Sequence, residues 1–403
     1  MSSDFRCSGT LLIYGKRRID GEMKQATQVA IIGAGIIGAS IAYNIAVQGL
    51  NDVTVFDRSK AGSGSTSAAL GGFRHQFSSE LSVELSKRSI AIIHKFKELT
   101  GYDPLVHKDG YIFIASKEES LEQLKRNRKM QRRLGVPVDL LSMGELSRNY
   151  PFYNFEGILG GTFCREDGHA STYAVHQGYV SKAKELGTEF YENTEVIGIE
   201  IASGRVTGLK TSQGKILAEK VIIAAGAYSG LVGSLASIDV PIKPYPRKIL
   251  VTHSFTDGIP PVIPLIIDVD STLAVGREGK GMIMSDNQKT VSSFDLVFPA
   301  GMDERIMEKA LYRMPAIAKA TISYANTGLY EMSPDANPII CEIPEIQGLY
   351  CCAGFAGHGF MHSPAIGELM AELLLKKRTS LDISSFHIQR FKDRQREKEG
   401  LII

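Results

Sequence analysis

Tryptophan is absent from the 403 residues, and cysteine is scarce, with five residues. The cysteines are odd in number and include no CxxC pair; they are Cys7, Cys164, Cys341, Cys351 and Cys352. This pattern argues against a disulfide framework and against a structural zinc site. We therefore expect a reducing compartment, with the cytoplasm as the location.

A strong charge of either sign is also missing. The 46 basic and 44 acidic residues leave a net charge of +2, which gives no general attraction to nucleic acid or to a membrane surface. Basic residues gather from Ser384 onward, but acidic residues alternate with them. We predict that the charged C-terminal tail, 384–403, is a solvated helix rather than a nucleic-acid arm.

Long hydrophobic runs are rare. Val29–Val47 is uncharged and close to the roughly 20 residues that a membrane span needs. Regularly spaced glycines, Asn44 and the β-rich segment that follows favour a buried strand and helix instead, so we predict no integral membrane segment. The chain is longer than one hydrophobic core usually supports, and two lobes are expected.

The chain does contain a glycine motif between two apolar runs. Its parts follow in the order strand, glycine-rich turn, helix, strand and acid: Val29–Ile32, then Gly33, Gly35 and Gly38, then Ala39–Gln48, Val53–Phe56 and Asp57. Glycines there allow a pyrophosphate to approach the start of a helix, and the acid accepts from a ribose hydroxyl. The motif predicts a dinucleotide-binding βαβ unit.

The residues before this unit have a different character. Residues 1–27 hold basic residues around a short apolar patch that is too short for a signal peptide. We predict that this N-terminal extension is disordered, or that Met23 is the true start.

The rest of the chain alternates helical and strand patterns. Helices are predicted over Leu81–Thr100, Glu118–Leu134, Tyr173–Leu186, Asp303–Leu311 and Pro364–Leu375, and buried strands over Gly110–Ala115, Lys220–Gly226 and Gly348–Gly354. The region from Pro241 to Pro299 is rich in β-branched residues and turns, which predicts an antiparallel sheet. Because nucleotide signals occur at both ends and in the middle, we expect interleaved domains: 28–90, 156–232 and 326–383 for the nucleotide, and 91–155 and 233–325 for the substrate.

Four segments together resemble the D-amino-acid oxidase superfamily of flavoproteins, in the branch of sarcosine oxidase β subunits, glycine oxidase and dye-linked proline dehydrogenase β subunits. They are GAGIIGASIAYNIA at 33–46, GSGSTSAALGGFRHQF at 62–77, KVIIAAGAYS at 220–229 and GLYCCAGFAGHGFMHSPAIGELMAELL at 348–374. The resemblance implies an α/β fold, with a Rossmann-type FAD-binding domain and an interleaved antiparallel-sheet substrate domain.

The resemblance also implies FAD as the cofactor and points to the residues that would bind it. They are Gly33, Gly35, Ile36, Ile37, Gly38, Asp57, Arg58, Ser65, Thr66, Ser67, Gly71, Gly72, Val196, Ala225, Gly226, Gly328, Gly354, Gly357, His358, Gly359, Phe360 and Met361. Related enzymes tether the flavin through a cysteine or histidine where this chain has Gly328 and Ala68, so the FAD is expected to be non-covalent. The lysine that activates oxygen in monomeric sarcosine oxidase aligns with Ile283, which makes oxygen a less favoured electron acceptor.

For the substrate, the resemblance points to Arg74, since the arginine of an RH pair binds the substrate carboxylate in the sarcosine oxidase pattern. A guanidinium matches a carboxylate with two parallel hydrogen bonds. His75, Tyr245, Arg247 and His362 are weaker candidates for the catalytic site. His358 and His362 lie four residues apart, but no further ligand with suitable spacing accompanies them, so no metal is predicted.

The activity implied is FAD-dependent oxidation of a small amino acid or secondary amine, of the proline, sarcosine or glycine type, by hydride transfer to flavin N5 to give an imine. A dehydrogenase is favoured over an oxidase. One alternative is a 2-hydroxy-acid or glycerol-phosphate flavoenzyme, with His75 or His362 as base. Another is an electron-relay β-type subunit of a hetero-oligomeric dehydrogenase. As partners we expect either further copies of this chain in a homo-oligomer or an FMN or iron–sulfur subunit in a hetero-oligomer.

Overall fold

The computed structural model describes residues 23–287, 290–392 and 398–401, and the disorder predicted for the first residues lies outside this part of the chain. The fold begins slightly earlier than residue 28. Strand β1 runs over Ala26–Ile32, and the carbonyl of Gln25 already accepts a hydrogen bond from Leu217 N at 2.9 Å. Burial alternates in the residues before Val29, where Thr27 is buried between the exposed Ala26 and Gln28, and this extends the strand beyond the fully apolar run seen in the sequence.

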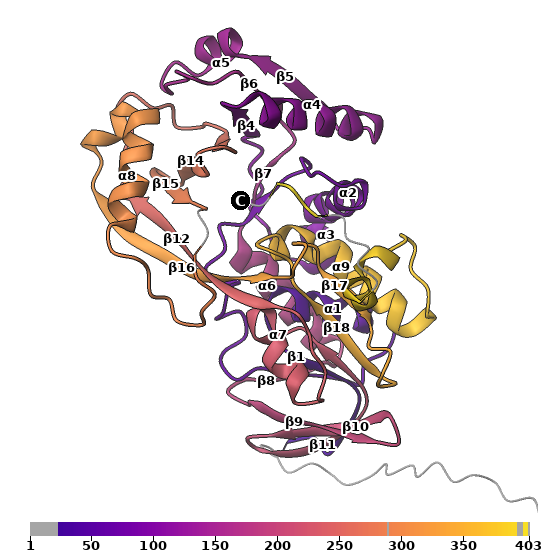
Figure 1. The fold of residues 1–403 in the computed structure, drawn as a ribbon. Coiled ribbons are helices and arrows are strands. Elements are labelled where there is room, and N and C mark those ends of the chain that lie inside the picture. The colour runs from indigo at the N-terminus through magenta and orange to yellow at the C-terminus, as the bar shows by residue number, and fades with distance from the viewer. Residues whose placement is uncertain (1–22, 288–289, 393–397, 402–403) are drawn as a thin grey trace, which may run out of the picture.

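Within the described residues, one eight-stranded sheet forms the core of the lower lobe in Figure 1. Its path is β17-β18-β11-β1-β2-β8, and β10 and β9 extend from β11 as an antiparallel meander. The further bounds are β2 Val53–Phe56, β8 Glu189–Tyr191, β9 Val196–Ala202, β10 Arg205–Thr211, β11 Gly214–Ile223, β17 Ile339–Glu342 and β18 Leu349–Ala353. The pairings β1–β2, β1–β11, β2–β8 and β11–β18 are parallel, as a dinucleotide-binding sheet requires.

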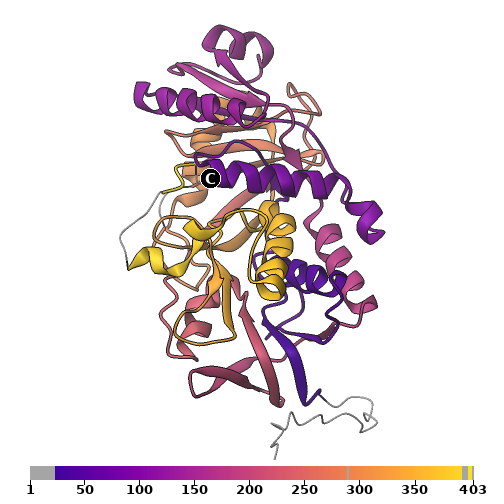
Figure 2. The same cartoon turned by 90° about the vertical axis from the view of Figure 1, so that its right-hand side faces the viewer.

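Helices cover one face of this sheet. Helix α1 (Ile36–Val47) packs against α6 (Thr172–Glu185) and α9 (Gly359–Lys376), as Figure 2 shows from the side. The approach of α1 to α9 is close because Gly367 has no side chain: a Cβ there would lie 2.2 Å from Ser40 Oγ. Asn44 donates to the Ser40 carbonyl at 2.9 Å, which satisfies the polar residue inside this otherwise apolar helix.

The second lobe is built on another sheet of eight strands among the residues described, in the order β16-β12-β15-β14-β13-β4-β6-β5. Its neighbours pair antiparallel except for β13 and β4. The bounds are β4 Tyr111–Ala115, β5 Val138–Ser142, β6 Gly160–Cys164, β12 Lys243–Thr252, β13 Leu265–Asp268, β14 Leu273–Glu278, β15 Gly281–Asp286 and β16 Ile322–Met332. The antiparallel sheet predicted between Pro241 and Pro299 is therefore confirmed in β12–β15.

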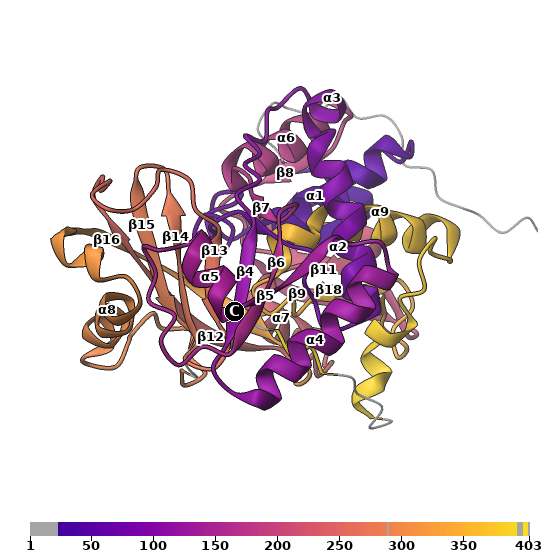
Figure 3. The ribbon, with the colours of Figure 1, turned by 90° about the horizontal axis from the view of Figure 1, so that it is seen from above.

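The remaining elements connect or cover the lobes (Figure 3). They are β3 Gly72–Phe73, β7 Gly168–His169, α2 Glu80–His94, α3 Phe96–Thr100, α4 Glu118–Arg133, α5 Met143–Asn149, α7 Ser229–Ser234 and α8 Met302–Arg313, with short 3-10 turns at Gly226–Tyr228, Pro315–Lys319, Ser384–Phe386 and Ile388–Phe391. No helix in the described ranges is both long and apolar enough to cross a membrane.

Two expectations need correction. The helix predicted over Leu81–Thr100 is interrupted at Lys95, which ends α2 and begins α3. The described part of the C-terminal tail is not a solvated helix: it forms short 3-10 turns, and Arg390 is buried against Asp335 with Nε 2.7 Å from Oδ2. An ion pair with a residue far away in the sequence therefore folds this charged segment onto the lobe.

Two strands do not pair in the sheet expected from the predicted interleaved segments. β6 and β16 lie in or across segments assigned to the nucleotide domain, yet both pair in the second sheet. The domain boundaries remain a prediction.

Candidate active site

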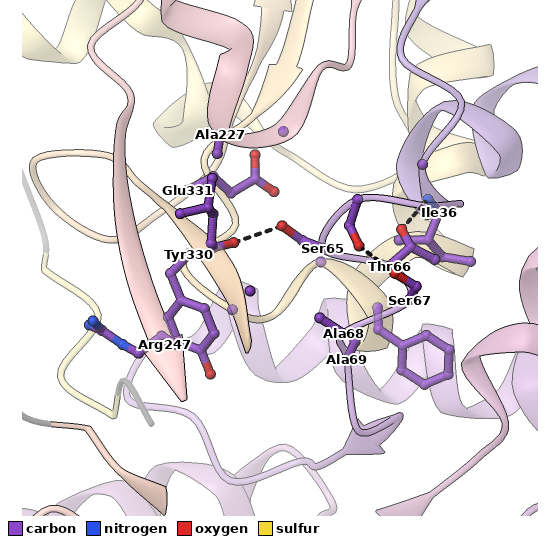
Figure 4. A pocket seen from close by; sticks show the side chains of 18 of the residues that line it. Ile36, Ser65, Thr66, Ser67, Ala68, Ala69, Ala227, Arg247, Tyr330 and Glu331 are labelled. Atoms are coloured by element: carbon purple, nitrogen blue, oxygen red, sulfur yellow. Dashed lines mark hydrogen bonds between the residues drawn. The ribbon is translucent and has the colours of Figure 1, made fainter. Parts of the chain in front are cut away.

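A cavity of about 870 Å³ lies where the two lobes meet. Its wall combines the β1–α1 turn, the loop from Asp57 to Gly72, the end of β11, strands β12, β15 and β16, and the start of α9. Figure 4 shows part of it, with the loop that carries Ser65 and Thr66 facing Tyr330 and Glu331 of β16. Segments distant in the sequence thus line a single site.

The turn after β1 is shaped by glycine at two positions. Gly33 has φ +110°, and a Cβ on it would lie 2.3 Å from the Ala224 carbonyl oxygen. A Cβ on Gly38 would lie 1.9 Å from the Gly33 carbonyl oxygen. Side chains at either position would push helix, turn and strand apart, so the glycines are needed for the close packing of a dinucleotide turn.

The N-terminus of α1 faces this cavity. Its N-cap is Gly35, which offers no side-chain cap, and no acidic residue lies in its first turn. Thr66 Oγ1 accepts from Ile36 N at 3.0 Å, as drawn in Figure 4. The positive end of the helix therefore meets the cavity without an acidic residue in its own first turn, which suits a pyrophosphate.

Asp57 ends β2 beside this turn. Its carboxylate accepts from Ala34 N at 2.8 Å and from Ser59 N at 2.9 Å, which fixes its position on the cavity wall. Arg58 lies over the ring of Tyr228 with its Cζ 3.7 Å from the ring centroid. This end of the cavity can thus hold a ribose and a flat ring.

The hydroxyl groups of the following loop are mainly engaged with the protein. Ser65 Oγ donates to the Leu329 carbonyl at 2.8 Å, and Ser67 Oγ donates to the Gly64 carbonyl at 2.9 Å. The loop therefore presents its backbone to a ligand rather than free serine hydroxyls. A Cβ on Gly328 would lie 2.9 Å from Ala68 Cβ, so the two positions that lack a tethering residue lie against each other on the cavity wall.

Arg74 lies in the wall at the other end of the cavity and is fully buried. Its Nη1 donates to the Gln76 carbonyl, and its Nη2 donates to the Leu401 carbonyl and lies 3.0 Å from His358 Nε2. Burial lowers the pKa of the Arg74 guanidinium, yet arginine keeps its charge at such sites. Its contacts at hydrogen-bond distance, as far as the chain is described, are two carbonyls and an imidazole, none of which carries a negative charge.

His358 is neutral. Burial, followed by the nearby Arg74 charge, holds the pKa of its imidazole well below its usual range. Because a guanidinium can only donate, Nε2 of His358 accepts and the proton is assigned to Nδ1. Glycines before and after this histidine place it at the start of α9, on the cavity wall.

Aromatic and apolar side chains complete this end. Tyr111 and Tyr330 line the cavity together with Leu265 and Ile283. Arg247 lies with its Cζ 5.0 Å from the centroid of the Tyr330 ring and also reaches the wall. The small, partly aromatic space beside Arg74 suits a small substrate with one anionic end.

The structure brings most of the predicted cofactor-binding residues together. Those on the cavity wall are Gly33, Gly35, Ile36, Ile37, Asp57, Arg58, Ser65, Thr66, Ser67, Gly71, Gly72, Val196, Ala225, Gly226, Gly328, Gly357, His358, Gly359, Phe360 and Met361. Gly38 and Gly354 do not line it. Gly38 packs α1 against the turn, and Gly354 N donates to Glu331 Oε2 at 3.0 Å, so both support the wall from behind.

Three of the predicted catalytic residues do not reach the cavity. His75 Nδ1 lies 2.8 Å from Asp167 Oδ1, which turns its ring into the protein. His362 packs on Phe77 with ring centroids 4.9 Å apart. Tyr245 pairs with Tyr330 across β12 and β16, and it is Tyr330 that lines the cavity.

Glu331 is a wall residue that the sequence did not reveal. Burial raises the pKa of its carboxyl to about 7, although backbone N–H groups of Gly354 and Phe355 oppose this shift. A Cβ on Gly359 would lie 3.7 Å from its Oε1. In the sequence, this stretch is singled out only for Gly328, which stands where related enzymes carry the residue that tethers the flavin. No local sequence pattern distinguishes a buried glutamate from an exposed one.

His75, Cys164 and Asp167 form a buried group whose possible ligand atoms lie within 4.8 Å of one another. Hydrogen bonds already fill it: Asp167 Oδ1 accepts from His75 N at 2.7 Å, and Oδ2 accepts from Gln76 Nε2 at 3.1 Å. Burial raises the pKa of the Cys164 thiol, which disfavours the thiolate that a metal would need. The prediction of no metal remains untested.

Comparisons with known proteins agree with this geometry. A family model described as "DAO: FAD dependent oxidoreductase" matches residues 28–373. Glycine oxidase of Geobacillus kaustophilus is 28% identical over 376 residues, which cover 91% of this chain and 98% of that protein. Human mitochondrial sarcosine dehydrogenase is 25% identical over 92% of this chain, but the match spans only 42% of that longer enzyme. Among solved structures, L-proline dehydrogenase from P. horikoshii superposes with a TM-score of 0.87 and 30% identity, covering 93% of this chain and 100% of that one.

Proposed function

Because the chain belongs to the DAO family of FAD-dependent oxidoreductases, we propose that it oxidises a small carboxylated amine of the proline, sarcosine or glycine type. Bound FAD would supply, at its N5 atom, the acceptor for a hydride from the carbon next to the amine nitrogen, and the substrate would become an imine. The named activities of the glycine oxidase, sarcosine dehydrogenase and L-proline dehydrogenase relatives support this substrate class.

The cavity fits the cofactor. The crowded glycines at 33 and 38, the start of α1 with no acidic residue in its first turn, and Asp57 suit the pyrophosphate and ribose of a dinucleotide. Gly328 and Ala68 meet on the wall where related enzymes carry a tether, and neither has a side chain that could form a bond to the flavin. Non-covalent FAD is the cofactor that these residues accommodate.

The observation that carries the substrate proposal is the buried guanidinium of Arg74, which has no anionic group at hydrogen-bond distance among the described residues. A substrate carboxylate at the wall would supply that negative charge and orient the molecule. The cation also disfavours a second positive charge nearby, which favours the neutral, reactive form of the amine. Tyr111 and Tyr330 would exclude water from the space around it.

A dehydrogenase is favoured over an oxidase. Ile283, which stands where monomeric sarcosine oxidase has its oxygen-activating lysine, lies on the cavity wall. Lys248 also reaches the wall, but its Nζ lies 2.6 Å from Asp303 Oδ1 and is paired there. The physiological acceptor and the cytoplasmic location stay predictions.

The 2-hydroxy-acid alternative is weaker because it needs a base beside the hydroxyl group. Neither His75 nor His362, the candidates for that base, lines the cavity. The relay-subunit alternative predicts a second chain in the complex. Purification of this protein at its natural expression level, with no other subunit overexpressed, would reveal a second chain that co-purifies with it.

The test uses the purified full chain. Its absorption spectrum is recorded before and after acid precipitation, and L-proline, sarcosine, glycine and 2-hydroxyglutarate are added separately without oxygen. We expect yellow colour in the supernatant, bleaching by one of the amines, and faster turnover with an artificial dye than with oxygen. Bleaching by 2-hydroxyglutarate alone would establish the alternative, and flavin retained in the precipitate would contradict non-covalent binding.

A further inference from the structure

We propose that the C-terminal strap, Glu399–Leu401, is part of the substrate site and holds Arg74 in the position that binds a carboxylate. This inference rests on the role proposed for Arg74, and it adds a positioning role for Glu399. Leu401, at the end of the strap, is buried, and its carbonyl accepts from Arg74 in the cavity wall. The strap therefore lies where its contacts can act on the substrate end of the cavity.

Glu399 anchors the strap. Its Oε1 accepts from Ser78 Oγ at 2.6 Å, from Ser78 N at 3.1 Å and from Leu401 N at 3.0 Å. The exposed fraction of this glutamate is 1%, although its neighbours Lys398 and Gly400 are exposed. A charged residue is seldom buried without specific partners, so this burial indicates a defined docking site.

Backbone contacts add to this anchor. Glu399 N donates to the Asp335 carbonyl at 3.1 Å, and Gly400 N donates to Ser78 Oγ at 2.8 Å. Ser78 precedes α2, and Asp335 lies between β16 and β17. The strap is thus held from two separate segments of the fold.

Leu401 connects the strap to the site. Its side chain packs in a cluster with Tyr111 and Phe113 of β4, and its carbonyl accepts from Arg74 Nη2. Tyr111 also lines the cavity. One residue of the strap therefore contacts both the arginine and the strand beside it.

The contact with Arg74 has an electrostatic reason. A fully buried guanidinium needs acceptors for its N–H groups, and the carbonyls of Gln76 and Leu401 supply two of them. Desolvation lowers the pKa of Arg74, and attraction to the Glu399 carboxylate is the largest of the opposing contributions. Without the strap, Arg74 would lose an acceptor and a nearby negative charge, and its side chain would be free to leave the orientation that faces the cavity.

The first experiment compares Glu399→Ala and Glu399→Gln with Lys398→Ala, which changes an exposed neighbour. We expect the alanine variant to raise KM for the amine about tenfold, the effect of one strong hydrogen-bonding anchor, with little change in kcat. The glutamine variant keeps an acceptor for Ser78 and Leu401 but removes the negative charge near Arg74, so its KM should lie between those of wild type and the alanine variant. Equal defects in both Glu399 variants, or an unchanged KM in the alanine variant, would overturn the positioning role.

A second experiment measures docking without any turnover. A Cβ on Gly400 would lie 3.8 Å from Ser78 Cβ, a spacing that suits a disulfide. In Ser78→Cys/Gly400→Cys we expect the disulfide to form in high yield on oxidation, as measured by mass spectrometry and thiol counting. Failure to form it would show that the strap does not dock, whatever the substrate of the enzyme is.

The same double variant separates a fixed strap from a gate. We expect the reduced form to have a higher KM than the oxidised form, because it lacks the Ser78 hydroxyl that anchors the strap and the disulfide takes the place of that anchor. The kcat should be the same in both forms, because the strap stays docked during turnover. Loss of activity on oxidation, with recovery on reduction, would show that the strap must leave, and it would overturn the proposal. If no amine is oxidised at all, acetate binding measured by its effect on the flavin spectrum replaces KM, with weaker binding expected in Glu399→Ala.

Discussion

Arg74 and His358 meet at the junction of the two predicted sites, with Arg74 Nη2 3.0 Å from His358 Nε2. Arg74 comes from the loop before α2 and His358 from the turn before α9, so the contact joins the substrate end of the cavity to the cofactor loop. The neutral imidazole takes one guanidinium N–H without cancelling its charge. That arrangement keeps the cation available to an anionic substrate while its orientation is fixed.

Replacing Arg74 by alanine should weaken substrate binding. We expect KM for the carboxylated amine to rise about 100-fold, as the loss of one buried charge pair implies, while the bound FAD remains. Steady-state kinetics and the ratio of flavin to protein absorbance measure both quantities.

Two variants control this experiment. Arg126→Ala removes an exposed arginine from α4 and should leave KM unchanged. Arg74→Lys keeps the charge but loses the planar fork, so it should fall between wild type and alanine. A KM within threefold of wild type in Arg74→Ala would remove the substrate anchor from the proposal.

Gly38→Ala tests the cofactor turn. The new Cβ would lie 1.9 Å from the Gly33 carbonyl oxygen, so the turn must open and FAD content should fall to a small fraction of the wild-type value. Gly144→Ala is the matched control, because no atom lies within 4 Å of the Cβ it would add. Equal flavin content in the two purified variants would show that the turn tolerates the change.

The predictability of the site follows the range of the interactions involved. The glycine turn and Asp57 could be predicted because their geometry depends on neighbouring residues in one short segment. The burial of Glu331 depends on a turn much later in the sequence, because Gly354 N, 23 residues away, donates a hydrogen bond to its carboxyl group. No local pattern carries that information.

The tail shows the same limit more strongly. Its alternating charges are typical of a solvated helix, yet Arg390 pairs with Asp335 across 55 positions and Glu399 accepts from Ser78 across 321. His75 is misleading for a related reason: it follows Arg74 directly, but Asp167, 92 positions away, holds its ring away from the cavity. Local sequence predicts which residues are near the site, and distant partners decide which of them face it.

His362 should make the FAD-free protein acid-sensitive. Burial, followed by the Arg74 charge, lowers the pKa of its imidazole to about 3. The unfolded chain binds a proton near pH 6.5 and the folded chain does not, so stability falls as the pH drops below 6.5 and stops falling near pH 3. At pH 5 this costs about 2 kcal/mol of unfolding free energy, from about 1.5 pH units at 1.36 kcal/mol each.

The variant His362→Leu removes this titration. It also removes Nε2, a buried polar atom that has no hydrogen-bond partner among the described residues, and leucine puts no polar atom in its place. Denaturant unfolding at pH 5 and pH 8 should therefore show the variant gaining on wild type at the lower pH only. A constant difference between the two proteins at both values would contradict the assignment.

Glu331 should act in the opposite direction. Burial raises the pKa of its carboxyl from 4.5 to about 7, so between these values the folded protein holds a proton that the unfolded chain has lost. Stability of the FAD-free protein therefore decreases as the pH rises from 4.5 to 7 and is level above that. Because Glu331 lines the cavity, water there screens part of the effect, and we expect the free energy of unfolding to fall by about 2 kcal/mol over this pH range.

Glu331→Gln keeps an acceptor for Gly354 N and cannot ionise, so its advantage over wild type should grow from pH 4.5 to pH 7 and then stay constant. The opposite pH direction separates this effect from that of His362 in the same unfolding series. A wild-type carboxyl that ionises near its usual value would give parallel stability curves for the two proteins. Such a result would mean that Glu331 carries a fixed negative charge beside Gly226 and Gly359, where the flavin is expected. That charge would disfavour an anionic reduced cofactor, whereas a protonated Glu331 would not.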